Sequence, residues 1–195
     1  MTLLEQEPQK TSREGRIAVL ETARLVLRAP RREDAKAIAL LMNDRRVAEN
    51  LLRIPLPYRL TDAEAFIATA SQTEGEPNYV ITSRDATIIG GCGLRKIDGA
   101  APDIGYWLGA PFWGQGYATE AARAIIDHAF ADLGYDALQG GARVSNPASR
   151  RVLEKCGFQW TGVGLYRIRA LKSSAPVDRF RLDRGLWASL KSWGK

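Results

Sequence analysis

Cysteine and histidine are scarce in this chain of 195 residues, which contains two cysteines and one histidine. Cys92 and Cys156 lie far apart, and neither belongs to a CxxC pair or to a Cys/His ligand spacing. His128 likewise has no second histidine or cysteine at the spacing that metal sites use. The sequence therefore predicts no metal site and no disulfide framework, and reduced thiols of this kind are typical of a cytoplasmic protein.

Long hydrophobic runs are also missing. The longest, Ala37 to Met42, is far shorter than the roughly 20 residues that cross a bilayer, so no membrane partner is expected. Residues 1–16 contain no apolar stretch of the kind that a secretory signal needs. The length suits one sizeable domain, which we place at 20–187 between a flexible N-terminal tail, 1–19, and a C-terminal tail, 188–195.

Charge is not concentrated in any one block, although the formal net charge is +6 and the pI is about 9.5. A basic balance suits a polyanion such as nucleic acid, anionic lipid or a phosphate-rich cofactor. Arginines scattered along the chain are equally consistent with a solvated surface of mixed charge. The sequence has no aromatic-plus-arginine platform and no recognition-helix signature, so a specific nucleic-acid partner is not expected.

The spacing of apolar residues predicts an α+β domain. The predicted strands are 23–29, 78–83, 88–96, 103–108, 138–144, 158–170 and 177–182, and the predicted helices are 32–43, 61–73, 114–133 and 146–157. Thr61 and Asn146 are expected to cap two of the helices, and Lys172–Ser174 is expected to form the last turn. Together these elements indicate a mixed, mostly antiparallel sheet with helices on both faces.

A glycine turn, Gly114-Gln115-Gly116, lies between a predicted strand and the clearest predicted helix. Unpaired amides and the positive dipole end at a helix N-terminus can bind phosphate oxygens, and glycine lets them approach closely. A dinucleotide fingerprint fits poorly, because Thr119 stands where its third glycine belongs. A Walker loop would need a Gly-Lys-Ser/Thr ending, which is absent. A glycine turn without a ligand stays open as the alternative.

Two motifs resemble the GNAT superfamily of N-acetyltransferases. Trp113 to Ala121, preceded by Ile104-Gly105-Tyr106-Trp107-Leu108, is similar to its acetyl-CoA motif. Residues 144–158, with the sequence VSNPASRRVLEKCGF, resemble the second signature of its RimJ/RimL-type branch, which contains enzymes acting on protein N-termini. Thr22 to Arg28 and Leu56-Pro57-Tyr58 are also similar to that branch, and the resemblance spans roughly residues 20–186.

This resemblance implies a six- or seven-stranded mixed sheet that is splayed where the pantetheine arm of acetyl-CoA enters. It implies acetyl-CoA as a cosubstrate, with its pyrophosphate on the amides of residues 114–118. The superfamily turn often begins with Gln or Arg, whereas this chain has Trp113, so one polar contact is lost. The residues expected to bind acetyl-CoA are Trp107, Leu108, Gly114, Gln115, Gly116, Tyr117, Ala118, Thr119, Asn146 and Ser149.

The resemblance also points to the catalytic residues. Asp103 stands where many relatives have a carboxylate that accepts the proton of the amine, although a surface aspartate is an equally good interpretation. The position of the tyrosine that often protonates the leaving thiolate is Leu153 here. In the RimJ/RimL branch a serine is the proposed acid, and Ser149 matches it, although a serine there often only bonds to the backbone. Tyr166 is a weaker acid candidate, and Glu120 is a poorer base candidate than Asp103.

The expected reaction is acetyl transfer from acetyl-CoA to a primary amine within a ternary complex. A protein N-terminal α-amine is one acceptor, and a small amine such as an aminoglycoside or a polyamine is the alternative. Few carboxylates lie near Arg45 to Tyr58, which favours a peptide. Because Leu153 replaces the usual tyrosine, a non-catalytic acyl-CoA-binding module also stays open. The sequence does not identify the oligomeric state, and a homodimer is one option.

Overall fold

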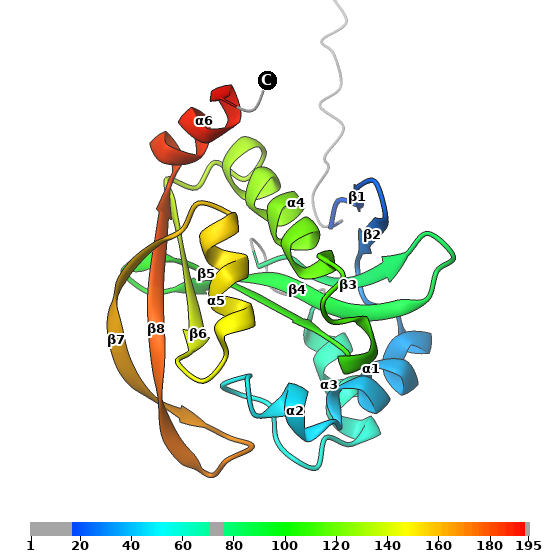
Figure 1. The fold of residues 1–195 in the computed structure, drawn as a ribbon. Coiled ribbons are helices and arrows are strands. Elements are labelled where there is room, and N and C mark those ends of the chain that lie inside the picture. Colours follow the sequence, from blue (N-terminus) through cyan, green and yellow to red (C-terminus); the bar gives the residue numbers. More distant parts are fainter. Residues whose placement is uncertain (1–16, 71–75, 194–195) are drawn as a thin grey trace, which may run out of the picture.

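The computed structural model describes residues 17–70 and 76–193. Their strands form one eight-stranded sheet in the order β1-β2-β3-β4-β5-β6-β8-β7 (Figure 1). Every neighbouring pair is antiparallel except β5 and β6. The strands are β1 Leu20–Glu21, β2 Leu25–Arg28, β3 Asn78–Ser83, β4 Ile88–Ile97, β5 Ala100–Leu108, β6 Ala137–Arg143, β7 Gln159–Ile168 and β8 Ser173–Asp183.

Six α-helices are present in the described ranges, together with two short 3-10 turns. The helices are α1 Ala35–Met42, α2 Arg45–Ala48, α3 Leu60–Ala70, α4 Tyr117–Ala131, α5 Pro147–Lys155 and α6 Arg184–Trp193, and the 3-10 turns are Arg32–Asp34 and Ala110–Phe112. The predicted α+β class with a mostly antiparallel mixed sheet is confirmed. The two-residue β1 brings the number of strands to eight.

The helices cover both faces of the sheet, as predicted. In β3, Tyr79 and Ile81 point into the core that α4 and α5 cover, whereas Val80 points into a smaller core under α1 to α3. This alternation follows from the two-residue repeat of a strand. In Figure 1, α4 and α5 lie together across one face of the sheet, and α1 to α3 form a separate group. Each face therefore carries its own helical layer.

The single parallel pair marks a break in the sheet. β5 and β6 pair only at Asp103 with Gln139 and at Ile104 with Gly140. β5 continues to Leu108 without a further partner on that side, so the two strands diverge beyond Ile104. Gly140 is required at this joint, because a Cβ there would lie 2.9 Å from Leu153 Cδ2 and 3.3 Å from Ile104 Cγ2. The splay predicted from the family resemblance is thus located between β5 and β6.

Several local predictions were wrong. Thr61 does not cap α3, since the helix begins at Leu60 and the Asp62 carboxylate accepts from the Arg59 amide at 2.8 Å. The last turn comes before Ser173, because β8 begins there and Lys172 adopts a φ of +54°. α2 is only four residues long, so it gives no periodicity from which a helix could be predicted.

The end of the chain also differs from the prediction. α6 extends through most of the segment predicted as a tail from 188 onward. It packs against α4, where the Trp187 and Phe130 ring centroids lie 5.2 Å apart and Trp187 Nε1 donates to Asp127 at 2.8 Å. Leu186, Leu190 and Trp193 stand at helical spacing, a signal for a helix that the prediction of a tail did not use. The predicted N-terminal tail lies mostly outside the described residues.

Membrane-spanning helices do not occur in the described ranges, since none of the helices combines the necessary length and apolar character.

Candidate acetyl-CoA site

The glycine turn presents a row of unpaired backbone amides at the start of α4. Gly114 and Gly116 have φ values of +77° and +80°, a region that only glycine adopts without strain. In the part of the chain that the structure describes, no amide from Gly114 to Thr119 donates to a protein acceptor, and the first bond runs from Glu120 to the Gly116 carbonyl. The turn itself is exposed. The amides that were predicted to bind pyrophosphate are therefore accessible.

Space for a ligand is open around the same turn. A Cβ placed on Gly114 would meet no protein atom within 4 Å. A hollow of about 640 Å³ opens beside Gly116 and Thr119, and it is lined by three basic side chains, Arg24, Arg123 and Lys155, and by three acidic ones, Glu21, Glu120 and Asp127. This mixed lining does not select an anion, whereas the free amides and the N-terminal dipole of α4 at the turn itself do. The residues present fit the pyrophosphate of acetyl-CoA.

Arg24 and Glu120 fix the turn to β2. Arg24 Nη1 donates to the Gln115 carbonyl at 2.9 Å, and Arg24 Nη2 lies 2.6 Å from Glu120 Oε2. Partial burial opposes ionisation of Glu120, but hydrogen bonds from Thr22 and Arg24 hold the pKa of its carboxyl below the usual value. Glu120 is thus an ionised structural anchor, which agrees with its low rank as a base.

The N-terminus of α5 contacts β5 through Ser149 and Tyr106. Asn146 caps this helix as predicted, accepting from the Ser149 amide at 3.1 Å, and Pro147 follows at the first helical position. The hydroxyl of Tyr106 donates to the Ser149 carbonyl at 3.0 Å and lies 3.0 Å from Ser149 Oγ. Burial raises the pKa of Tyr106, so its hydroxyl stays protonated at neutral pH.

Tyr106 is a functional candidate that the sequence did not single out. Its side chain points to the α5 face because it shares the strand parity of Ile104. The contact between Tyr106 and Ser149, which lies 43 residues later in the chain, depends on where α5 packs. Strand parity was available from the sequence, but the placement of α5 was not.

Trp107 and Leu108 occupy the free end of β5. Trp107 is half-buried against the core under α1 to α3, and Leu108 is buried on the opposite face. Trp113 Nε1 donates to the Leu108 carbonyl at 2.8 Å, which ties the end of β5 to the glycine turn. Trp113 therefore has a structural contact that replaces the missing polar side chain of the superfamily turn. The direct contacts of Trp107 and Leu108 with acetyl-CoA stay predictions.

Asp103 lies on the other face of the sheet from Ser149. Its carboxylate accepts from Arg95 at 2.8 Å and from Arg179 at 2.6 Å, and its side chain is 14% exposed. Arg179 also donates to Gln139 at 3.0 Å. Both oxygens of Asp103 are therefore engaged by guanidinium groups, so accepting a proton would require the loss of at least part of an ion pair. Asp103 as the base stays a prediction.

The remaining catalytic alternatives lie away from the turn. Leu153 is 1% exposed in the core, and the Tyr166 ring lies 5.6 Å under the Arg179 guanidinium. His128 pairs with Asp132 at 2.7 Å on α4. Within 17–70 and 76–193, no three His, Cys, Asp or Glu side chains form a group that could hold a metal ion.

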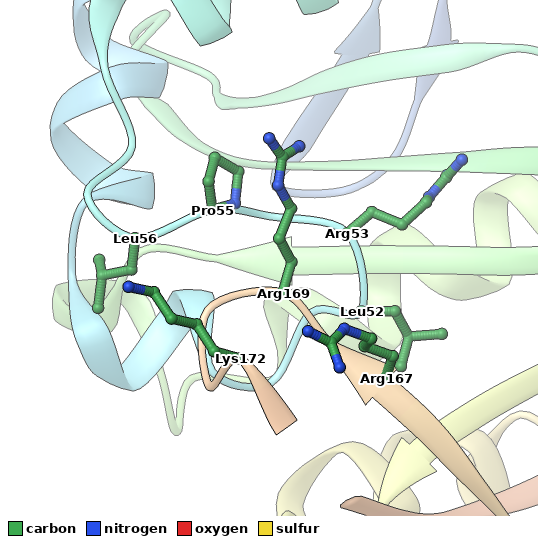
Figure 2. Close-up of a pocket in the computed structure, with 7 residues that line it drawn as sticks. All are labelled: Leu52, Arg53, Pro55, Leu56, Arg167, Arg169 and Lys172. Atoms are coloured by element: carbon green, nitrogen blue, oxygen red, sulfur yellow. The ribbon is translucent and has the colours of Figure 1, made fainter. Parts of the chain in front are cut away.

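A second cavity lies between the loop after α2 and the turn that joins β7 to β8. Its volume is about 600 Å³, and Figure 2 shows the side chain of Arg169 extending beside Pro55, whereas that of Arg53 extends away from Pro55. The lining residues are Leu52, Arg53, Pro55, Leu56, Arg167, Arg169 and Lys172. This basic cavity is formed by segments more than 100 residues apart, which is why the sequence did not reveal it.

An accessible anion site at a helix N-terminus, next to a splayed parallel strand pair, defines a class of acyl-CoA-binding transferases. The chain belongs to the GNAT acetyltransferases, since the family model described as an acetyltransferase (GNAT) domain matches residues 24–159. It is an acetyl-CoA-dependent acyltransferase, with acetyl-CoA as cosubstrate.

Similar proteins agree with this family. The uncharacterised N-acetyltransferase p20 of Bacillus licheniformis is 30% identical over 150 residues, covering 74% of this chain and 84% of its own. The uncharacterised N-acetyltransferase YoaA of Bacillus subtilis is 29% identical over 153 residues, covering 74% and 85%. The fold matches a spermidine N-acetyltransferase from Vibrio cholerae in complex with CoA and spermine, at a TM-score of 0.73 and 20% identity, covering 86% and 99%.

Proposed function

We propose that this enzyme transfers the acetyl group of acetyl-CoA to the α-amine of a peptide or protein N-terminus. The observation that carries the proposal is the state of Asp103, the preferred candidate for the base, whose carboxylate is engaged by Arg95 and Arg179. A site without a free carboxylate suits an amine that needs little help to lose its proton. The similarity of residues 144–158 to the RimJ/RimL signature supports the same acceptor.

The ordinary pKa values of amines favour an α-amine. With a pKa near 8, roughly one α-amine in ten is neutral at pH 7, whereas with a pKa near 10.4 only about one lysine amine in a few thousand is neutral. Only the neutral amine attacks the thioester carbonyl. A lysine acceptor would therefore depend much more on a general base.

In this proposal the residues have distinct roles. The amides of Gly114 to Ala118 bind the pyrophosphate, and the free edge of β5 lies along the pantetheine arm. Ser149 Oγ supplies a proton to the departing thiolate. The serine oxygen then takes up the proton that the amine nitrogen loses as the amide forms, which restores the hydroxyl. Tyr106 lies 3.0 Å from Ser149 Oγ, stays protonated because of burial, and orients and stabilises the serine oxygen during this exchange. The two hydroxyls thus replace the single tyrosine whose position is taken by Leu153.

Direct transfer is supported over a covalent acyl-cysteine route. Cys156 Sγ lies 4.0 Å from the Thr119 carbonyl, in the first turn of α4. Burial raises the pKa of Cys156 to about 11, and Arg123 offsets this only in part. Roughly one Cys156 thiol in ten thousand is then a thiolate at pH 7, and the thiolate is the reactive form. We therefore propose a ternary complex in which the amine attacks the thioester itself.

Two measurements test the proposed function. Titration calorimetry with acetyl-CoA should show one site of micromolar affinity, and absence of binding at hundreds of micromolar would refute the assignment of residues 114–118. Release of CoA thiol should then require a peptide with a free N-terminus. The same peptide with its α-amine blocked and a free lysine is the matched control, and mass spectrometry of the product locates the acetyl group. Turnover of only the blocked peptide would contradict the proposal.

The compartment and the oligomeric state are separate proposals. Cys92 and Cys156 are free, and Cys92 is buried, so no disulfide joins them. This supports the cytoplasm as the compartment. The homodimer stays a prediction, which gel filtration with light scattering can test.

A further inference from the structure

The lining of the basic cavity contains four cationic side chains and no carboxylate. The four are Arg53, Arg167, Arg169 and Lys172. None of the four forms an ion pair or a side-chain hydrogen bond with another described residue. Most other described arginines do, including Arg95 and Arg179 close by. Like charges that share one concave surface repel each other, so this cavity is prepared to receive negative charge.

The backbone conformation of Lys172 and the electrostatic surroundings of Arg53 support the same conclusion. Lys172 has a φ of +54°, a left-handed backbone conformation that is unfavourable for a non-glycine residue. Burial by surrounding atoms, together with the nearby charge of Arg95, lowers the pKa of Arg53 from its usual value. Glu76 and Asp103 offset this effect only in part, so the charge of Arg53 is incompletely compensated. A bound anion would relieve this.

The basic cavity lies close to the splay between β5 and β6. The Arg169 amide donates to the Leu52 carbonyl at 2.9 Å, so the end of β7 holds the loop after α2. Arg143, near the end of β6, donates to the Glu49 carbonyl at 2.7 Å, and its Nε is buried without a partner. These contacts place the loop beside the diverging end of β6. The glycine turn lies at the start of α4, so the basic cavity and the glycine turn are separate sites.

The lining also indicates what kind of anion fits. Leu52, Pro55 and Leu56 provide aliphatic walls between the cations, and no aromatic side chain lines the cavity. Binding of single-stranded nucleic acid normally relies on aromatic platforms for the bases. Aliphatic walls with separated cations suit a peptide that carries carboxylates. A polyamine would be repelled by all four side chains.

We propose that the basic cavity binds the carboxylates of an acidic peptide whose N-terminal amine is acetylated at the splay. The inference rests on the proposed function and narrows its acceptor to N-terminal segments with Asp or Glu in the first few residues. Arg53 and Arg169 determine this specificity by contact with the peptide, and the amine itself reacts beyond them, toward Ser149.

The test compares peptides of equal length on the full chain. One has acidic residues at positions two to four, one has the corresponding amides, and one has lysines; free glutamate and spermidine complete the panel. At about 50 mM salt, KM for the acidic peptide should be roughly tenfold below that for the amide peptide, and the difference should shrink at about 0.5 M salt. Thiol release measures turnover.

Charge reversal supplies the matched variants. Arg169→Glu should raise KM for the acidic peptide by about tenfold and change KM for the amide peptide by less than about twofold. Lys36→Glu makes the same change in net charge on the exposed face of α1, and it should alter neither KM. Binding of acetyl-CoA by calorimetry shows that each variant is folded. Arg53→Gln serves as the second cavity variant if Arg169→Glu does not fold.

The possible outcomes distinguish a failure of the acidic specificity from a failure of N-terminal acetylation. Equal KM values for acidic and amide peptides, with normal turnover, would overturn the acidic specificity and leave N-terminal acetylation intact. Turnover of spermidine without any peptide would overturn both. Turnover of free glutamate alone would overturn the peptide as acceptor. Tight binding of random RNA in competition with the acidic peptide, abolished by Arg169→Glu, would assign the cavity to nucleic acid instead.

Discussion

Replacing Gly114 by alanine tests the anion site most directly. Gly114 has a φ of +77°, and an added Cβ would meet no protein atom within 4 Å. The folded backbone can therefore persist, at a cost of roughly 1–2 kcal/mol in the free energy of unfolding for an L-residue in the left-handed region. The same methyl group would project into the open space where the pyrophosphate is expected.

The loss of affinity can be estimated from the amides. A hydrogen bond to a charged group contributes about 1.5–3 kcal/mol, so displacing the phosphate from one amide weakens acetyl-CoA binding by roughly 10- to 150-fold. Titration calorimetry measures this change. Urea unfolding without ligand measures the change in stability separately.

Gly99 provides the matched control. It lies in the turn between β4 and β5 with a φ of +69°, and a Cβ there would also meet nothing within 4 Å. Gly99→Ala should therefore destabilise the fold by a similar amount and leave acetyl-CoA affinity unchanged. If Gly114→Ala bound acetyl-CoA as tightly as Gly99→Ala does, the pyrophosphate would not lie on this turn.

Three further predictions follow from the site and the core. Ser149→Ala should lower kcat by about 100-fold and Tyr106→Phe by about tenfold, with the double variant no worse than Ser149→Ala, because Tyr106 acts only through Ser149; additive losses in single-turnover rates would refute this coupling. kcat/KM for a peptide should rise about tenfold per pH unit from pH 6 to about 8 and then level off, as the α-amine loses its proton; a rise that continues to about pH 10 in initial-rate assays would indicate lysine. Asp34 is 2% exposed and accepts two bonds from Arg28, at 2.7 and 2.8 Å, so Asp34→Asn should cost about 3 kcal/mol in urea unfolding. Burial opposes ionisation of Asp34, but Arg28 holds the pKa of its carboxyl below the usual value. The contribution of the ionised Asp34 to the free energy of unfolding is therefore complete above about pH 4 and is lost as the pH falls further. An acid-unfolding midpoint that is the same in Asp34→Asn as in the wild type would contradict this.

Much of the fold could be predicted because its signals are local. The cap at Asn146, the glycine turn before α4 and the alternation along β2 each depend on a few neighbouring residues. The errors came where tertiary contacts decide. α6 is fixed by Trp187 against Phe130, and its helical spacing was present but was not weighed.

The candidate site divides in the same way. The amides of residues 114–118 were predictable, because a glycine turn and a helix start adjoin in the sequence. The pairing of Tyr106 with Ser149 was not, since it depends on how α5 lies over β5. The basic cavity joins Arg53 to Arg169 across the chain and has no local signature.

The carboxylate of Asp103 has a mechanical consequence beyond its chemistry. It joins Arg95 on β4 to Arg179 on β8 at the one place where the two halves of the sheet are hydrogen-bonded in parallel. Two ion pairs therefore hold the two halves of the sheet together at the point where β5 and β6 begin to diverge. A lower kcat in Asp103→Asn would not by itself identify Asp103 as the base. Loss of these ion pairs would also let the two halves of the sheet separate, which would shift α5, and Ser149 with it, relative to α4.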